Sequence, residues 1–408
     1  MQVILKAERE KPVIQNHPWI FSGAIEKIEG EPQDGDIVDV LDNEGNFLAR
    51  GYLNQKSQIT VRILTKDIEE EVNEALFRKR IVDAVNYRGD TLGLPLKRRD
   101  APECPSDAAN PTYEAYRLIH DAADLLPGLI VDKYSDYLVV QILTLGIERR
   151  KNLIVGILDD LLAPKGIYER SDSRIREKEG LTLRKGLVRG QEPPDLVTIQ
   201  QNAVRLKVNF KEGQKTGAFL DQRENLEIAA SYAEDREVLD CFCYTGSFSI
   251  WTAFRGAKKV VGVDMSNRAL ETAQQNAEMN GVSDICKFIQ GDVFQVLGGC
   301  RRSFDLIILD PPGFAKSKRA VEKAARAYKH INMTAMEILR PNGILVTFSC
   351  SHHIDPLLFR KIIFAASVDA GCNVRIIRTL HASPDHPINI AYPEGEYLKG
   401  LICQKMSQ

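Results

Sequence analysis

Two reactive side chains follow apolar segments that we predict to be neighbouring strands. Asp310 directly follows Leu306–Leu309, and Cys350 lies just beyond Ile344–Phe348. Adjacent strands of a sheet lie about 4.8 Å apart, so a carboxylate and a thiol at their ends would flank one cavity. A thiolate can add to an electron-poor carbon, and a carboxylate can hold the polar edge of the molecule under attack. The pair therefore predicts covalent catalysis at one edge of a sheet.

The turn that begins at Asp310 is expected to be rigid. Pro311 and Pro312 each fix φ and remove a backbone donor, so the turn presents the Asp310 side chain and the preceding carbonyls. Methyltransferases that act on planar nitrogen-bearing groups use such an Asp-Pro-Pro turn to hold the base. A plain turn at a strand end is the alternative interpretation.

Cys350 indicates which atom of a base would react. Cytosine C5 is too weak a nucleophile to take up a methyl group directly, whereas a thiolate that adds to C6 turns C5 into an enamine carbon. Free cysteine has a pKa of about 8.5, so the site must lower it or take up the thiol proton. The base must also leave its stack. His352 and His353 follow Cys350, but the acceptor of the C5 proton stays unassigned, and a buried packing role is the alternative for Cys350.

A second group of residues, in Val238–Asp264, indicates a bound nucleoside. The pattern is strand, turn, helix and strand, and the second strand ends at Asp264, whose carboxylate could accept hydrogen bonds from ribose hydroxyls. Where a dinucleotide fingerprint has three glycines, the turn has Phe242, Tyr244 and Gly246. This favours an adenosine-type ligand, with the two aromatic side chains as an apolar wall.

Further aspartates are predicted at the carboxyl ends of strands, where ligands of open α/β sheets bind. Asp292 follows Cys286–Ile289 and could accept a hydrogen bond from an adenine amino group. An aspartate there could equally cap the next helix. Because Asp240, Asp264 and Asp292 recur in strand order, we favour a cofactor site.

The elements that position these residues begin near Asp195. From there the chain alternates strands and helices, which predicts a mostly parallel, Rossmann-like sheet with helices on both faces. The last two strands, Val374–Leu380 and Tyr397–Cys403, are joined by a loop with three prolines and no helix, so they should pair antiparallel. A parallel sheet with an antiparallel terminal hairpin is typical of class I S-adenosylmethionine methyltransferases rather than of nicotinamide dehydrogenases.

Two smaller domains are predicted before this one. Residues 1–66 resemble a PUA domain, a small β pseudo-barrel of RNA-modifying enzymes, on His17–Gly23, Gly35-Asp36 and Phe47–Tyr52. Eight Lys/Arg against ten Asp/Glu in this segment make a general phosphate-binding role weak, and an orienting role is the alternative. Residues 67–194 are predicted to form an α+β insert without a catalytic constellation, and residues 195–408 the methyltransferase domain.

Composition narrows the choice of partners. The 408 residues carry a net charge of −2, so a nucleic acid would have to meet a local basic patch. Lys316, Lys318 and Arg319, next to the base turn, form such a patch, with a solvated surface as the alternative. No apolar run is long enough to span a membrane, and the eight cysteines lack disulfide or metal spacing. A cytoplasmic protein with reduced thiols and no metal is expected.

In combination, these motifs resemble one bacterial family across the whole chain, the 23S (large-subunit) ribosomal RNA cytosine-5 methyltransferase I family. The shared features include Lys215–Arg223, Phe242–Gly246, Asp310-Pro311-Pro312 and Ser349–His352. Two positions depart from the family pattern: Cys243 stands where a small hydroxyl residue or glycine is expected, and Ser247 stands where a glycine is common. The resemblance implies S-adenosylmethionine as methyl donor, 5-methylcytidine as product and Cys350 as nucleophile. The resemblance also places Gln222, Tyr244, Gly246, Asp264, Asp292 and Asp310 around the cofactor and base. We predict that Phe242, Thr245 and Met265 also contact the cofactor, and that RNA is bound by Lys316, Lys318, Arg319 and Arg50.

Three rival functions stay open at this point. An RNA guanine or adenine N-methyltransferase would use the Asp-Pro-Pro turn without a cysteine, so Cys350 distinguishes it. A non-catalytic RNA-binding assembly factor would keep the sheet and lose cofactor binding. A nicotinamide oxidoreductase is disfavoured by the glycine-poor turn and the terminal hairpin.

Overall fold

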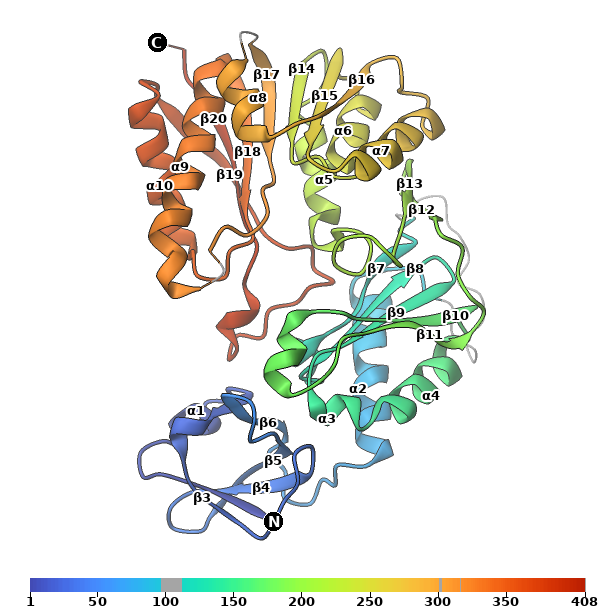
Figure 1. Cartoon of the computed structure of the whole chain (residues 1–408), viewed down its shortest axis with the longest axis vertical. Helices are drawn as coiled ribbons and strands as arrows, with labels where there is room; N and C mark the ends of the chain where they lie inside the picture. Colours follow the sequence, from blue (N-terminus) through green and yellow to red (C-terminus); the bar gives the residue numbers. More distant parts are fainter. Residues whose placement is uncertain (97–111, 301–302, 316, 408) are drawn as a thin grey trace. The chain divides into compact units, whose positions relative to one another are not determined.

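The computed structural model describes residues 1–96, 112–300, 303–315 and 317–407 (Figure 1). They form two compact units. Unit 1 consists of Met1–Asn202, Val208–Leu220 and Pro384–Gly395, and unit 2 consists of Ala203–Lys207, Asp221–Ser383 and Glu396–Gln408. The three-domain boundaries expected at residues 66 and 194 stay a prediction.

The N-terminal part of unit 1 is a six-stranded sheet with the order β2-β6-β5-β4-β1-β3. Strands β4 and β5 form a hairpin, since they pair antiparallel. The strands of this six-stranded sheet enclose a core that includes Val3, Leu5 and Val61. The element bounds are β1 (Gln2–Leu5), α1 (Lys11–Ile14), β2 (Trp19–Phe21), β3 (Ile25–Glu29), β4 (Ile37–Leu41), β5 (Phe47–Leu53) and β6 (Ile59–Thr65).

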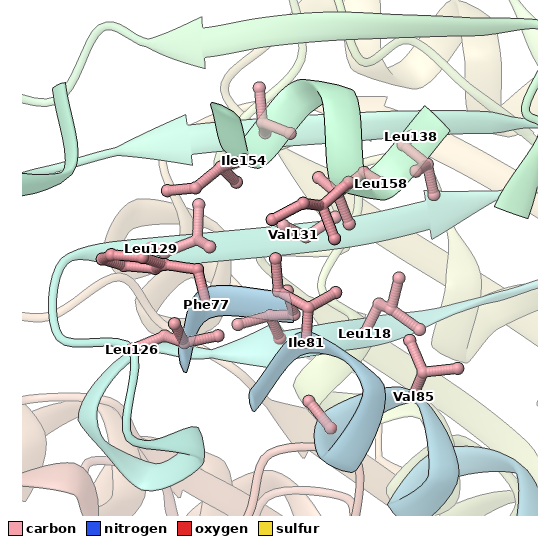
Figure 2. Packing of buried hydrophobic residues seen from close by; sticks show 14 of the residues in the cluster. Phe77, Ile81, Val85, Leu118, Leu126, Leu129, Val131, Leu138, Ile154 and Leu158 are labelled. Atoms are coloured by element: carbon pink, nitrogen blue, oxygen red, sulfur yellow. The ribbon is translucent and has the colours of Figure 1, made fainter. Parts of the chain in front are cut away.

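A second sheet of unit 1 has the order β11-β10-β9-β8-β7 and carries helices α2 (Glu74–Asn86) and α4 (Lys151–Leu162). Apolar residues of α2 recur at helical spacing, as in Phe77, Ile81 and Val85, and pack on the sheet (Figure 2). Asn73 caps α2 by accepting from Leu76 N. The other bounds are β7 (Ala115–His120), β8 (Leu129–Tyr134), β9 (Tyr137–Ile142), α3 (Leu145–Glu148), β10 (Gly166–Ser171) and β11 (Arg184–Gly190). This is the predicted α+β arrangement.

Unit 2 is built on a seven-stranded sheet with the order β16-β15-β14-β17-β18-β20-β19 (Figure 1). Strands β16, β15, β14, β17 and β18 pair parallel, whereas β20 runs antiparallel to both of its neighbours. The predicted parallel sheet with an antiparallel terminal hairpin is therefore confirmed. The strand bounds are β14 (Glu237–Cys241), β15 (Lys259–Asp264), β16 (Cys286–Gln290), β17 (Phe304–Leu309), β18 (Leu339–Ser349), β19 (Val374–Leu380) and β20 (Lys399–Lys405).

Helices cover both faces of this sheet. Helices α8 (Val293–Gly299), α9 (Val321–Ile338) and α10 (Pro356–Asp369) share one core with the strands, in which Tyr328 and Phe359 are buried. Helices α6 (Ser247–Phe254) and α7 (Asn267–Met279) pack on the strands from the other side, with α5 (Arg223–Ala230) against α6. In the chain, β12 (Val197–Gln201) and β13 (Val204–Val208) precede these elements. No helix among the described residues is long and apolar enough to cross a membrane.

Candidate active site

Strand register brings the predicted site residues to one edge of the unit 2 sheet. Cys241, at the end of β14, pairs with Val263 of β15 and with Leu309 of β17, and Leu309 in turn pairs with Thr347 of β18. The carboxyl ends of four parallel strands therefore lie side by side. The strand order reverses at β14, which is the point where ligands of open α/β sheets bind.

The turn after β14 has a strained backbone. Phe242 and Tyr244 adopt φ values of 63° and 49°, a left-handed conformation that side chains disfavour by roughly 1–2 kcal/mol. Gly246 has φ 78°, and a Cβ there would come within 2.9 Å of Ala273 Cβ, so the turn requires glycine at this position. Asn276 of α7 donates to the Thr245 carbonyl at 3.0 Å. The surrounding elements thus hold a loop whose shape a free chain would avoid.

The Asp264 side chain lies beside this turn and is held there by backbone N–H donors. Its two carboxylate oxygens accept from Tyr244 N at 3.0 Å and from Ser266 N at 2.9 Å. Each oxygen has a second lone pair, so the carboxylate can also accept from ligand hydroxyls. Met265, the next residue, is 65% exposed and supplies an apolar surface beside the carboxylate. This arrangement fits the ribose and base of a nucleoside.

Asp292 caps the helix that follows β16. Its side chain accepts from Phe294 N and Gln295 N at the start of α8, as the capping alternative predicts. Both bonds use Oδ1, and neither uses Oδ2. Capping and a hydrogen bond to adenine are therefore compatible, and the second role stays a prediction.

Asp240 lies beneath the turn and is almost completely buried. Ser249 of α6 donates to its Oδ2 at 2.6 Å. Burial, together with the negative charges of Asp310 and Asp264, raises the pKa of Asp240 to about 7. A carboxyl that can carry a proton near neutral pH limits the repulsion among three acids at one sheet edge.

The side chain of Asp310 is oriented by a relay of amides. Gln222 donates from Nε2 to Asp310 Oδ2 at 3.1 Å. Asn225 fixes which end of the Gln222 amide faces Asp310, because it donates to Gln222 Oε1 at 2.6 Å and also to the His381 carbonyl at 2.9 Å. The sequence prediction assigned Gln222 to the cofactor, whereas here it contacts the carboxylate of the base turn. Asn225 was not foreseen, since nothing in its local sequence marks it.

Cys350 lies against the Asp-Pro-Pro turn, as the strand argument predicts. Its thiol donates to the Pro311 carbonyl at 3.7 Å. A Cβ built on Gly313 would lie 3.6 Å from Cys350 Sγ, an ordinary van der Waals contact, so Gly313 of the turn lies beside the thiol. The Cys350 residue is half-buried, which leaves part of it accessible. The Cys350 thiol and the Asp310 carboxylate are thus presented from neighbouring strands.

Residues around the adjacent Ser351 complete this end of the site. Ser351 Oγ accepts from Ala315 N at 3.1 Å and lies 3.0 Å from the Tyr328 hydroxyl. Lys399 donates from Nζ to the Ser351 carbonyl at 2.9 Å and is buried. Tyr328 and Lys399 were not predicted from the sequence. The available signal for Lys399 was a single charged residue in the otherwise uncharged segment 397–404.

The predicted RNA-contacting residues lie in different surroundings. Lys318 and Arg319, on a short turn of helix before α9, are exposed. Lys316 lies outside the described residues. Arg50, in unit 1, pairs with Asp39 at 2.6 Å and donates to the Ile68 and Glu70 carbonyls, so it has intramolecular partners. The proposed contacts of all four with RNA stay predictions.

Comparison with known families matches both predicted end domains. Residues 3–66 match a PUA-like domain, and residues 187–392 match the family of S-adenosylmethionine-dependent methyltransferases. A solved S-adenosylmethionine-dependent methyltransferase from Streptococcus mutans covers 99% of this chain and 100% of its own with a TM-score of 0.82, at 21% identity. A methyltransferase structure solved in complex with SAH has a TM-score of 0.83 at 22% identity and covers 99% of this chain and 100% of its own. The fold and family define a class I methyltransferase that uses S-adenosylmethionine.

Closer relatives identify the family more narrowly. Ribosomal RNA large subunit methyltransferase I of Aeromonas salmonicida (strain A449) is 44% identical over 98% of both chains. The protein of the same name from Yersinia pestis bv. Antiqua (strain Angola) is 40% identical over 100% of both. This chain therefore belongs to the ribosomal RNA large subunit methyltransferase I family.

Proposed function

We propose that the protein methylates C5 of a cytosine in large-subunit ribosomal RNA and that Cys350 is the attacking nucleophile. The observation that carries the proposal is the contact of the Cys350 thiol with the turn that presents Asp310, 3.7 Å from the Pro311 carbonyl. The names of the relatives support the RNA substrate. An N-methyltransferase would need the carboxylate turn and would have no use for the thiol.

The cofactor end of the site is proposed to hold S-adenosylmethionine. Asp264 would accept from the ribose hydroxyls, and the exposed Met265 side chain would cover one face of the adenine. Asp292 Oδ2 would accept from the adenine amino group. When bound, the cofactor supplies an electrophilic methyl group to the base. The remaining proposed contacts come from the turn after β14, namely Phe242, Tyr244, Thr245 and Gly246, and from Gln222 and Asp310.

At the base end, Cys350 is proposed to act on an unstacked cytosine. Its thiolate forms a bond to C6, and the electron pair of the C5–C6 double bond makes C5 nucleophilic. After C5 has been methylated, loss of the C5 proton restores the double bond and breaks the S–C6 bond, which returns the thiolate. No described residue is assigned as the proton acceptor.

Asp310 is proposed to bind the N3/N4 edge of the cytosine. A carboxylate oxygen can accept from the N4 amino group and so orient the base, and a protonated carboxyl can donate to N3, where negative charge develops when the thiolate adds to C6. Gln222 keeps the carboxylate aimed, since its Nε2 donates to Oδ2 at 3.1 Å. This assigns Gln222 a positioning role at the base, beside its predicted place near the cofactor.

The RNA backbone is proposed to meet exposed cations near the base turn. Lys318 and Arg319 are exposed and follow that turn by a few residues. Lys316 would extend the patch, and Arg50 of the PUA-like domain is a further proposed contact. Because these are phosphate contacts, they would add affinity without sequence preference.

Mapping of the modified nucleotides tests the proposal. Large-subunit RNA from a strain without the gene should lack one or more 5-methylcytidines, which mass spectrometry of RNA fragments detects. The wild-type gene and a Cys372→Ala control should restore them. Cys350→Ala should not, although its affinity for S-adenosylmethionine should stay near that of wild type by calorimetry. Full restoration by Cys350→Ala, or a lost mark on a purine nitrogen, would sink the proposal.

A further inference from the structure

We propose that the buried Lys399 ammonium is a positioning residue that favours the thiolate form of Cys350. This inference rests on the proposed function, in which the thiolate attacks the base. It concerns a residue of the terminal antiparallel strand β20, far from the cysteine in the sequence. The role follows from where the ammonium is anchored.

Lys399 is fixed next to the cysteine from two directions. Strand register pairs Lys399 with Ser349, the residue before Cys350. Its Nζ donates at 2.9 Å to the carbonyl of Ser351, the residue after Cys350. Lys399 is 4% exposed, so its charge acts through protein rather than water. The Lys399 ammonium is thus held next to residues 349–351, the short segment that carries the Cys350 thiol.

The charged and titratable groups around this pair come from several elements. Lys399 interacts electrostatically with Cys350, Glu396 and Asp355, each of which favours the ammonium, whereas burial lowers the pKa of Lys399 to about 8. Asp355 caps α10 by accepting from Leu358 N, and Glu396 lies 3.7 Å from His381. Tyr328 of α9 interacts electrostatically with Cys350, and burial raises the pKa of its phenol. Other titratable groups near the thiol are Asp310, which follows the neighbouring strand β17, and His352 and His353, which follow Cys350 in the chain.

Interaction between two titrating groups is reciprocal. If the thiolate favours the ammonium, the ammonium favours the thiolate by the same free energy. Since both carboxylates near Lys399 have other partners, the thiolate is the anion whose formation the lysine assists. Lys399 is not the acceptor of the C5 proton, because its Nζ is buried and already donates to a carbonyl. Its contribution is electrostatic.

Alkylation kinetics test this role without RNA or cofactor. The full-length protein is treated with iodoacetamide over a range of pH, and mass spectrometry follows the peptides that contain Cys350 and Cys372. In Lys399→Met, the Cys350 curve should move to higher pH by about one unit, and Lys399→Arg should return most of the shift. An unchanged Cys350 curve in a folded Lys399→Met variant would overturn the proposal.

A matched control uses a lysine at the other end of β20. Lys405 donates to the Met336 and Leu339 carbonyls and acts electrostatically on Cys372. Lys405→Met should therefore shift the Cys372 curve and leave the Cys350 curve in place, whereas Lys399→Met should do the reverse. Shifts of both curves in both variants would indicate general loosening of the fold and contradict a specific role.

If Lys399→Met does not fold, the reciprocal measurement decides. The titration of Lys399 is followed by NMR of protein labelled with [ε-13C]lysine, with the signal assigned from Lys399→Arg. In Cys350→Ala, the ammonium should lose its proton at lower pH than in wild type, and identical titrations would overturn the proposal. A result against the role of Lys399 would not contradict the proposed reaction, because the test of the reaction is whether Cys350→Ala abolishes methyl transfer.

Discussion

The two ends of the site, on the same edge of one sheet, are built in different ways. At the proposed cofactor end, Asp264 is held by backbone N–H groups of Tyr244 and Ser266, 20 and 2 residues away in the chain. At the proposed base end, Asp310 is held by the side chain of Gln222, 88 residues away, and the segment around Cys350 by Lys399. Backbone donors are present whatever the side chains are. The base end therefore depends on particular residues far apart in the sequence, and single substitutions should affect the two ends differently.

The largest effect is expected from removal of the acid at the cofactor end. Asp264→Ala should weaken S-adenosylmethionine binding about 100-fold, because it removes the carboxylate that shapes the turn and that we propose to accept from the ribose hydroxyls. Asp264→Asn keeps one oxygen and should cost about 10-fold. Calorimetry measures both, with circular dichroism to verify the fold. A dissociation constant close to that of wild type in Asp264→Ala would remove Asp264 from the cofactor site.

Gln222→Ala tests which end of the site depends on Gln222, because the sequence predicts a cofactor contact and the structure shows a hydrogen bond to Asp310. Loss of one hydrogen bond to a charged group should lower kcat about 10-fold. The affinity for S-adenosylmethionine should hardly change. The opposite outcome, a weakened affinity with kcat intact, would return Gln222 to the cofactor end. Single-turnover methyl transfer combined with calorimetry separates the two.

The smallest effect is expected for Asp240, the buried acid below the turn after β14, and it concerns the pH dependence of stability. Burial raises its pKa to about 7, above that of an unfolded aspartate, so the folded protein binds a proton that the unfolded chain releases. Stability should therefore fall as pH rises from about 4, with the full penalty present above about pH 7. Between pH 6 and 8, wild type should lose about 1 kcal/mol of unfolding free energy relative to Asp240→Asn.

Urea unfolding at the two pH values measures the Asp240 effect. The same substitution at the exposed Asp284 serves as control and should follow the wild type. Equal pH dependence of wild type and Asp240→Asn would show that Asp240 is ionised throughout this range. The burial argument would then be wrong.

The sheet was predictable from the sequence because its signals are local. Short apolar segments end in aspartates, a helix separates each parallel pair, and the last two strands lack a helix between them, which predicted the antiparallel hairpin of β19 and β20. The contact of Cys350 with the Asp310 turn followed from the same pattern. These parts of the site depend only on strand order.

The side chains that orient the reactive groups were not predictable in this way. Asn225 and Lys399 lie on α5 and β20 and reach the site through tertiary packing, which no spacing in a single sequence reports. Asp292 shows that one local pattern can indicate two roles, since an acid at a strand end predicted a ligand contact or a helix cap, and the structure shows the cap while the ligand contact stays a prediction. Local patterns thus indicate where the reactive groups lie, and long-range packing decides how they are held.

Covalent trapping with 5-fluorocytidine tests the role of Cys350 most directly. A fluorine at C5 cannot leave as a proton does, so addition of the thiolate to C6 followed by methylation should leave RNA bound to the enzyme. With substrate RNA containing 5-fluorocytidine and S-adenosylmethionine, we expect a stable adduct on the peptide that contains Cys350, and none in Cys350→Ala. Methylation of this RNA without an adduct, or an adduct on another residue, would contradict the proposed mechanism.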